Sequence, residues 1–496
     1  MTPTGLVRLE EVVDRCGIAA GLELALPTGG RPRQLPVRTL LVGMLASAAD
    51  GRPAHLTRVH QSLVALDSAD RRRLGVDVDW RSGPHRLTYR QVERTFGLLE
   101  AVLAAGTNNG GPGEALSAAV DALVEASIPQ RYKQATTALA VDWTDLETWA
   151  VAPHSEQTGA DPDASWGHRA SHAIGVKDEL FYGYYPQMAT MVPEEHGPPV
   201  PELVRRILVT SCHLDPPPAF VAVLKRMHHK GIPLGDILAD SGYAHRVATA
   251  WALPLRQLGA RLVQDHHPHD RGPKGTHNGA VIANGNLYCP ATPPALLNLG
   301  PLPRAATPDA TAAHDTKTGE AARYKLGRIT IDDTDGYHRV QCPAAAGKTR
   351  CPLRPDSLNL GAEHPEILSP PQHPPTCCTQ QTITVPPQVN AKTAQKHDYP
   401  GADWRASYAR RSGAERTYST LKDPATTNTN RGWCRLMGLT AITLFLTCAV
   451  VTRNQRITDA FETRETENTR RATLNKPPLT RRRQRKTLTQ LTATPP

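Results

Sequence analysis

Two aspartates each end a short hydrophobic run that is typical of a buried β-strand. Asp142 ends the run at residues 137–142, and Asp240 ends the run at residues 236–240. A rigid strand end can hold a carboxylate toward the crevice where open α/β sheets bind ligands. Carboxylates suit Mg²⁺, and two such ions about 3.5–4 Å apart can hold the attacking and leaving oxygens of a phosphodiester. An aspartate at a strand end is also a common turn residue, so each one alone favours the structural interpretation.

A third carboxylate lies in residues 408–422, the segment YARRSGAERTYSTLK. In a continuous helix, Arg411, Glu415 and Lys422 follow Tyr408 by 3, 7 and 14 residues. At about 100° per residue these three side chains fall on nearly one face. A carboxylate between two cations could bind a metal ion while the cations contact phosphates. A surface helix with ordinary charge pairing would show the same pattern.

The sequence here resembles the bacterial insertion-sequence transposases of the DDE type. Residues 408–422 reproduce the family's Y-R-E-K signature at its fixed gaps. The run VDWT at residues 141–144 resembles the motif of the first catalytic aspartate, and ADSGY at residues 239–243 resembles that of the second. The resemblance covers about residues 135–455. Trp143 departs from it, because many members have a small residue at this position.

The resemblance implies a ribonuclease H-like catalytic core that binds two Mg²⁺ ions. The implied metal ligands and catalytic residues are Asp142, Asp240 and Glu415. Arg411 and Lys422 would contact phosphates of the transposon end, and Tyr408 would help to place them. The implied partner is double-stranded DNA, both the terminal inverted repeats and the target, bound by a homodimer in the bacterial cytoplasm at the nucleoid. The implied reaction cleaves the ends and joins them to the target.

Two other functions stay open at this stage. A metal-dependent nuclease with the same core would cut DNA without joining strands. A non-catalytic DNA-binding protein, left over from a transposase, would bind without cutting. The presence of all three carboxylates argues against decay of the site. Some relatives hold a flipped base on a tryptophan of the insertion, and none occurs here between Trp251 and Trp404, which puts a hairpin route in doubt.

The order of strand and helix patterns along the sequence predicts an α/β fold. We expect a mixed sheet that is flanked by helices and interrupted by an insertion. Residues 1–130 lack strand patterns and predict an all-helical DNA-binding domain, with helices near residues 36–48 and 87–103. Residues 135–265 predict the first part of the core: a strand, a hairpin of two strands (171–176 and 181–192), a helix, a strand, a helix and a strand. The second part is expected at residues 401–455, and a basic, disordered tail at residues 456–496.

The insertion at residues 266–400 is rich in proline and cysteine. It holds 19 of the 44 prolines and five of the nine cysteines, which favours loops and short strands. Four of these cysteines, at positions 342, 351, 377 and 378, could bind a structural zinc ion, but their spacing is not that of compact pairs, so free buried thiols are favoured. The run His266–His269 could bind a metal, although a solvated loop is the simpler interpretation.

The net charge and the hydropathy of the chain say little about its partners. The formal charge is +10, but the last 44 residues carry eleven basic and four acidic side chains and so hold +7 of it. The block at residues 481–486, RRRQRK, predicts phosphate attraction without sequence specificity, although a tail with no partner fits equally. The N-terminus shows no secretory signal. The uncharged run at residues 436–452 is at the short limit for a membrane span and predicts a buried helix instead, so no membrane is expected.

Overall fold

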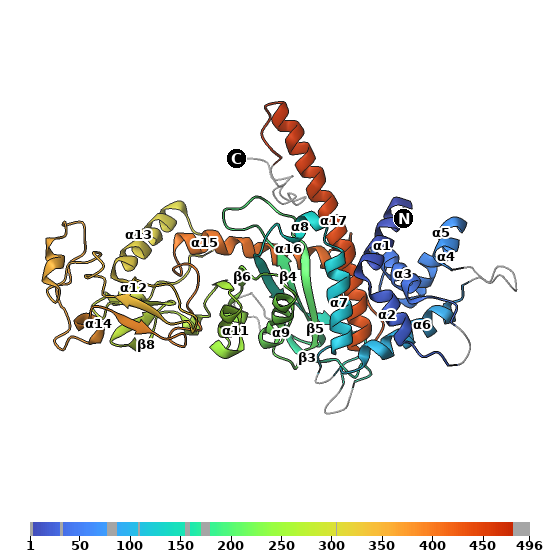
Figure 1. Ribbon diagram of the computed structural model, residues 1–496, viewed down its shortest axis with the longest axis horizontal. Helices are drawn as coiled ribbons and strands as arrows, with labels where there is room; N and C mark the ends of the chain where they lie inside the picture. The colour runs from blue at the N-terminus through green and yellow to red at the C-terminus, as the bar shows by residue number, and fades with distance from the viewer. Residues whose placement is uncertain are drawn as a thin grey trace, which may run out of the picture.

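The computed structural model shows an elongated molecule in which three parts lie in a row (Figure 1). The N-terminal helices lie at one end, a mixed sheet with its helices lies in the middle, and the insertion lies at the other end. The structure describes residues 3–29, 33–76, 87–107, 110–153, 159–169, 179–303 and 305–479.

The central sheet has seven strands, and it confirms the α/β class. They are β1 (Leu139–Trp143), β2 (Leu146–Glu147), β3 (Ser165–Arg169), β4 (Glu179–Met191), β5 (Val204–Ser211), β6 (Asp236–Ala239) and β7 (Arg261–Gln264). The long strand β4 pairs antiparallel with β1 and β5 over overlapping residues, so these two strands lie on opposite edges of it. β1 then pairs parallel with β6, and β6 pairs parallel with β7. The order across the sheet is therefore β5-β4-β1-β6-β7, and β2 and β3 extend it along β4.

Helices cover both faces of this sheet, and the alternation of side chains decides what each face presents. Leu139 and Val141 pack with α9 (Pro216–His229) and α11 (Ala252–Gln257). Ala138 and Ala140 pack on the other face, which α15 (Ala402–Tyr408) and α16 (Ser412–Lys422) cover. Successive side chains of a strand point to opposite faces. Asp142, the next even-numbered residue of β1, therefore lies on the sheet face that α16 covers.

Two strands differ from the sequence prediction. Strand β4 is the predicted stretch at residues 181–192, but its hairpin partner is β3, while the predicted partner at residues 171–176 lies outside the described residues. Strand β5 was not predicted, because Arg205 and Arg206 interrupt its apolar pattern. All eight residues of β5 are nevertheless buried. Arg206 is 1% exposed and donates from Nη1 to Glu125 Oε2 at 2.8 Å, so its charge is compensated by the helix that covers the strand.

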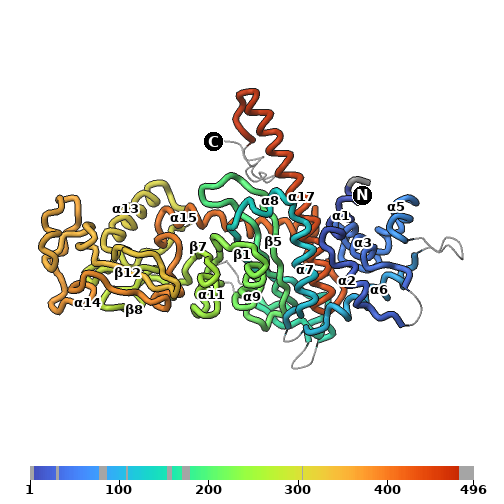
Figure 2. The backbone as a smooth tube through the Cα atoms, in the orientation of Figure 1, coloured from blue at the N-terminus to red at the C-terminus, as the bar shows by residue number. Residues whose placement is uncertain are grey.

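The N-terminal region is helical, as predicted, and shares one hydrophobic core with the long helix α17 (Leu439–Thr473). Its helices are α1 (Pro3–Cys16), α2 (Ile18–Ala25), α3 (Val37–Ala49), α4 (Leu56–Val64), α5 (Ser68–Arg73), α6 (Tyr89–Ala104), α7 (Glu114–Ala126) and α8 (Gln130–Lys133). Figure 2 shows α17 running beside α7, and α17 also contacts α3 and β5. Residues 439–454 are buried throughout, as the sequence predicts for a core helix. Within the described part of the chain, no helix is long and apolar enough for a membrane span.

The tail prediction is wrong for residues 456–473, because they continue α17 and project from the body (Figure 1). The first part of this extension is held by the N-terminal helices: Arg8 pairs with Asp459 at 2.9 Å, and Arg131 pairs with Glu462. Phe461 also packs edge-on against Tyr132. These contacts give a polar sequence a fixed neighbour, which composition alone does not reveal.

The insertion contains two small sheets rather than loops alone. The first consists of β8 (Pro273–His277), β9 (Ala280–Ala283) and β10 (Asn286–Tyr288), and the second of β11 (Gly327–Arg328), β12 (His338–Gln341) and β13 (Ile383–Val385). The predicted short strands are thus present. The sequence did not predict α13 (Pro308–Tyr324), which buries only Ala321 and so lacks an apolar stripe. Its start has a proline in the first turn and the Thr307 side chain accepting the Ala310 amide.

Candidate active site

The fold brings the three predicted carboxylates around one cation. Asp142 lies at the end of β1, Asp240 directly follows β6, and Glu415 lies in the first turn of α16. Arg411 reaches all three: its Nη1 lies 3.6 Å from Asp142 Oδ2, and its Nη2 lies 4.0 Å from Asp240 Oδ2 and 3.3 Å from Glu415 Oε1. We call Asp142, Asp240 and Glu415 the acid cluster. The parallel pairing of β1 and β6 explains the meeting of the two aspartates, since both strands end at the same edge.

The signature segment, residues 408–422, is not the continuous α-helix that the sequence predicted. Helix α15 ends at Tyr408, a 3₁₀ turn follows over Ala409–Arg411, and α16 begins at Ser412. This turn places Arg411 Nε 3.0 Å from the hydroxyl oxygen of Tyr408, to which it donates. The partly buried phenol ring is stacked on Trp404, with ring centres 4.9 Å apart. Tyr408 therefore orients Arg411 rather than facing the cleft itself.

Lys422 departs from the acid cluster and joins a neighbouring ion network. Its Nζ lies 2.9 Å from Asp145 Oδ1, and the other oxygen of Asp145 accepts from Arg169 at 2.7 Å. Arg169 also donates to Glu147 at 2.6 Å. The predicted single face of cations therefore divides into two: Arg411 lies among the three acids, and Lys422 lies beside Asp145. Asp145 was not predicted, although it follows Asp142 by three residues in the same DWTD run.

The environment of Asp142 disfavours its charged form. Burial raises the pKa of Asp142 to about 7, and the negative charge of Asp240 adds to this effect, while Arg411 opposes it. Asp240 is held differently: its Oδ1 accepts the backbone amides of Gly242 at 2.9 Å and Tyr243 at 3.4 Å as the cap of the short helix α10 (Ser241–Ala244). Arg411 Nη1 is buried without a hydrogen-bond partner. Acids that are clustered in this way, one of them with a raised pKa, are arranged to attract cations.

A cleft of about 1250 Å³ opens beside the acid cluster. Its charged walls carry five carboxylates and three guanidinium groups, contributed by Asp142, Asp145, Asp215, Asp240, Glu415, Arg169, Arg246 and Arg411. His168 and His213 also line it. Sequence reasoning missed Arg169 and Arg246, which carry no motif signal beyond the closeness of Arg246 to Asp240. The excess of acids over fixed cations suits the binding of additional cations.

Trp143, the departure from the family pattern, lies in the wall of this cleft. Its ring packs against Tyr243 with centres 4.6 Å apart. A Cβ atom on Gly242 would lie 2.5 Å from the Trp143 ring and 3.1 Å from Asp240 Oδ1. The large side chain of Trp143 thus requires a residue without a side chain at position 242, two positions after Asp240.

A buried ion network holds the signature segment from behind. Asp236 is fully buried at the start of β6, and its Oδ2 accepts from Arg410 and Lys396, both at 2.8 Å. Its Oδ1 accepts from Arg261 at 2.8 Å. Arg410 also donates to the carbonyl oxygen of Pro193 at 3.0 Å. Because Arg410 precedes Arg411, this network fixes the turn that presents Arg411 to the acids.

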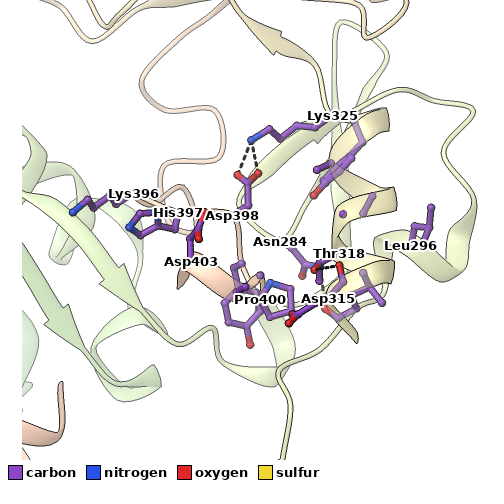
Figure 3. Close-up of a pocket in the computed structure, with 18 residues that line it drawn as sticks. Asn284, Leu296, Asp315, Thr318, Lys325, Lys396, His397, Asp398, Pro400 and Asp403 are labelled. Carbon is purple, nitrogen blue, oxygen red and sulfur yellow. Dashed lines mark hydrogen bonds and ion pairs between the residues drawn. The ribbon is translucent and has the colours of Figure 1, made fainter. Parts of the chain in front are cut away.

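A second pocket, of about 480 Å³, lies where the insertion meets α15 (Figure 3). Across it, Lys325 donates to both oxygens of Asp398, each at 2.6 Å. Nearby, Arg405 of α15 donates to Asp315 of α13 at 2.5 Å. None of the predicted site residues lines this pocket. The ion pair between Arg405 and Asp315 fixes the insertion against α15, the helix that leads into the signature segment.

Metal-ligand side chains gather at one further place. Within the described residues, one trio has all its donor atoms within 4.8 Å of one another, namely His245, His267 and Asp270. The five cysteines of the insertion are buried and free, and they form no such trio. The predicted solvated loop at residues 266–269 is wrong for His266, which is 1% exposed and stacks on Tyr399 with ring centres 4.1 Å apart.

Comparison with known proteins does not extend these observations. No protein-family model matches the chain, and no curated protein matches it significantly.

Proposed function

We propose that the protein is a DNA transposase with a ribonuclease H-like core, which cleaves transposon ends and joins them to target DNA. One observation carries the proposal: the acid cluster surrounds Arg411 at distances of 3.3 to 4.0 Å, at the end of two parallel strands and beside a large cleft. Three residues from segments about 100 and 175 positions apart meet there, in the order D, D, E that the sequence resemblance implies. The mixed sheet with helices on both faces supports the proposed core.

The residues present fit the two Mg²⁺ ions that this function requires. The donor set consists of carboxylate oxygens, which hard divalent cations prefer. The guanidinium group of Arg411 already occupies the space between them, with Nη1 buried and lacking a hydrogen-bond partner, so the cluster holds positive charge as it stands. Asp142, Asp240 and Glu415 would hold the ions, whose chemistry is to activate the attacking oxygen and stabilise the leaving oxygen of the phosphodiester.

The other residues would bind and orient the DNA. Arg411 would turn from the acids to a phosphate, while its neighbour Arg410 keeps the 3₁₀ turn in place through Asp236. Lys422 would present its charge at the edge of the cleft, positioned by Asp145. Tyr408 would orient Arg411 through its hydroxyl group. Arg169 and Arg246, in the cleft wall, are further candidates for phosphate contacts.

A strand-joining assay tests the proposal. Purified protein, Mg²⁺ and DNA that carries the repeats flanking the gene should yield joined products. Asp142→Asn, Asp240→Asn and Glu415→Gln should each abolish cleavage and joining while leaving DNA binding, because each keeps the side-chain shape and removes one metal-binding charge. Asp356→Asn, a change of an exposed aspartate in the insertion, is the matched control and should leave all activities unchanged.

The possible outcomes separate the proposal from its alternatives. Cleavage without joining would identify a metal-dependent nuclease. Binding without cleavage would identify a DNA-binding remnant. Full activity of any one of the three variants would show that the substituted residue is not needed for catalysis.

A further inference from the structure

Three histidines from two segments of the chain meet beside the loop that carries Asp240. His245 directly follows α10, whereas His267 and His269 lie in the turn after β7. The rings of His245 and His267 are tilted by 34° to each other with centres 3.9 Å apart, and those of His267 and His269 lie 4.9 Å apart. Asp270 completes the group, and its Oδ2 lies 3.6 Å from His245 Nδ1. We call these four residues the histidine cluster.

Asp270 presents an unsatisfied oxygen to this cluster. Its Oδ1 is held by Lys392, whose Nζ donates to it at 2.7 Å. Its Oδ2 is buried and has no hydrogen-bond partner. A buried carboxylate oxygen without a partner is unusual, and a bound ion is one of its ordinary explanations. The fixed Oδ1 also determines where Oδ2 points, so this oxygen is held in position for a ligand.

Loss of hydration and the neighbouring rings of His245 and His269 lower the pKa of His267, which favours its neutral form. The Nδ1 atom of His267 accepts the backbone amide of His269 at 3.2 Å. A metal ion on neutral His267 would replace this bond, either by binding at Nδ1 itself or by binding at Nε2 with the ring proton moved to Nδ1.

We propose that the histidine cluster is a binding site for a transition-metal ion of the zinc class. His245, His267 and Asp270 supply two nitrogen ligands and one oxygen ligand, whose donor atoms all lie within 4.8 Å of one another. Imidazole nitrogen combined with one carboxylate suits Zn²⁺ and Co²⁺, whereas Mg²⁺ prefers oxygen alone. The site is therefore chemically distinct from the acid cluster, and the inference does not depend on the proposed function.

The position of the site gives the ion a structural consequence. Helix α10 is four residues long, with Asp240 as its N-terminal cap and His245 as its C-terminal cap. A metal ion on His245 would tie the far end of this helix to the turn at residues 268–270. The helix would then be fixed at both ends, and with it the carboxylate of Asp240.

Metal titration of the full-length protein tests the site. After removal of metals with a chelator, Zn²⁺ is titrated by calorimetry and Co²⁺ by its visible absorption. One ion per chain should bind, and His245→Ala or His267→Ala should each weaken binding by roughly a hundredfold, at the upper end of the losses seen when metal-site partners are removed. Asp270→Asn should weaken it as well, without removing side-chain volume. His373→Ala, which changes an exposed histidine of the insertion, should bind as the unchanged protein does.

Further variants keep the test decisive. Asp142→Asn with Glu415→Gln should retain the zinc-class ion, because these residues belong to the acid cluster. Circular dichroism checks that each histidine variant is folded, and Asp270→Asn provides the result if one is not. The proposal is overturned if no ion binds, or if binding survives all three changes in the histidine cluster. Binding that is lost instead in Cys342→Ser would assign the ion to the insertion cysteines and would equally overturn it.

Discussion

Asp236→Asn tests the argument that a buried ion network positions the signature segment. Asp236 is fully buried and accepts hydrogen bonds from Arg261, Lys396 and Arg410, each at 2.8 Å. Asparagine keeps the volume but removes the negative charge. Breaking a buried ion pair by removing one partner costs about 3–5 kcal/mol. We expect a loss of about 3 kcal/mol, the lower end of that range, because the side chains of Arg261 and Lys396 are 55% and 20% exposed and regain some hydration.

The effect should depend on pH with a definite sign. Burial by itself would raise the pKa of Asp236, but hydrogen bonds from Lys396 and Arg410 outweigh it and leave the pKa below its ordinary value. A carboxyl whose pKa is lowered on folding stabilises the protein above its unfolded pKa of about 4 and loses this contribution as the pH falls through the folded value. The difference between the unchanged protein and Asp236→Asn should therefore be complete at pH 7 and shrink below about pH 4.

Two measurements check this prediction. Urea unfolding gives the free-energy difference, and hydrogen–deuterium exchange over residues 402–422 reports the local effect, which should be faster exchange around the 3₁₀ turn. Asp356→Asn, the same change at an exposed aspartate of the insertion, is the matched control and should change the free energy of unfolding by less than about 0.5 kcal/mol. If Asp236→Asn unfolds within about 0.5 kcal/mol of the unchanged protein, as surface changes do, and exchanges at the same rate, then the network does not hold the turn.

Two further predictions concern packing. Gly242→Ala should lower stability by about 1–3 kcal/mol, because its Cβ would lie 2.5 Å from the Trp143 ring; thermal unfolding of the double variant with Trp143→Ala should show most of this loss relieved, and simple additivity would contradict the contact. A chain ending at Thr473 should be as stable as the full chain, whereas one ending at Thr458 should lose about 2 kcal/mol from one aromatic contact and two surface ion pairs. Equal urea unfolding of the two truncated chains would show that the extension of α17 adds nothing.

The sequence predicted those parts of the fold in which local pattern and tertiary environment agree. The strand ends at Asp142 and Asp240 follow short apolar runs that are buried in the sheet, so pattern and burial coincide. Strand β5 was missed because Arg206 is buried against Glu125, a residue about 80 positions earlier, and no local pattern reveals such a partner. Helix α13 was missed for the opposite reason, since it is mostly exposed and carries no apolar stripe.

The candidate site shows the same limit at finer scale. Spacing predicted that Arg411 and Glu415 lie together, and they do, because a separation of four residues brings side chains together in helical geometry. The prediction that Lys422 lies on the same face, fourteen residues after Tyr408, was wrong. The segment is not one continuous helix, and the ammonium group of Lys422 pairs with Asp145. Tyr408 was predicted to help place the DNA, but its buried hydroxyl group contacts Arg411 directly. Long spacings along a helix therefore predicted less than the short ones.

Two consecutive arginines explain why the 3₁₀ turn matters. Arg410 reaches Asp236 at the start of β6, and Arg411 reaches Asp240 just beyond its end. Four residues of extended strand separate these aspartates by roughly 13 Å, so the two guanidinium groups must diverge strongly from adjacent positions. The turn contacts both β1 and β6, and it thus lies across the strands that carry the acids. Because Arg410 secures the turn through Asp236, the proposed binding of cations at the acid cluster would require the Arg411 side chain to move while the turn stays in place.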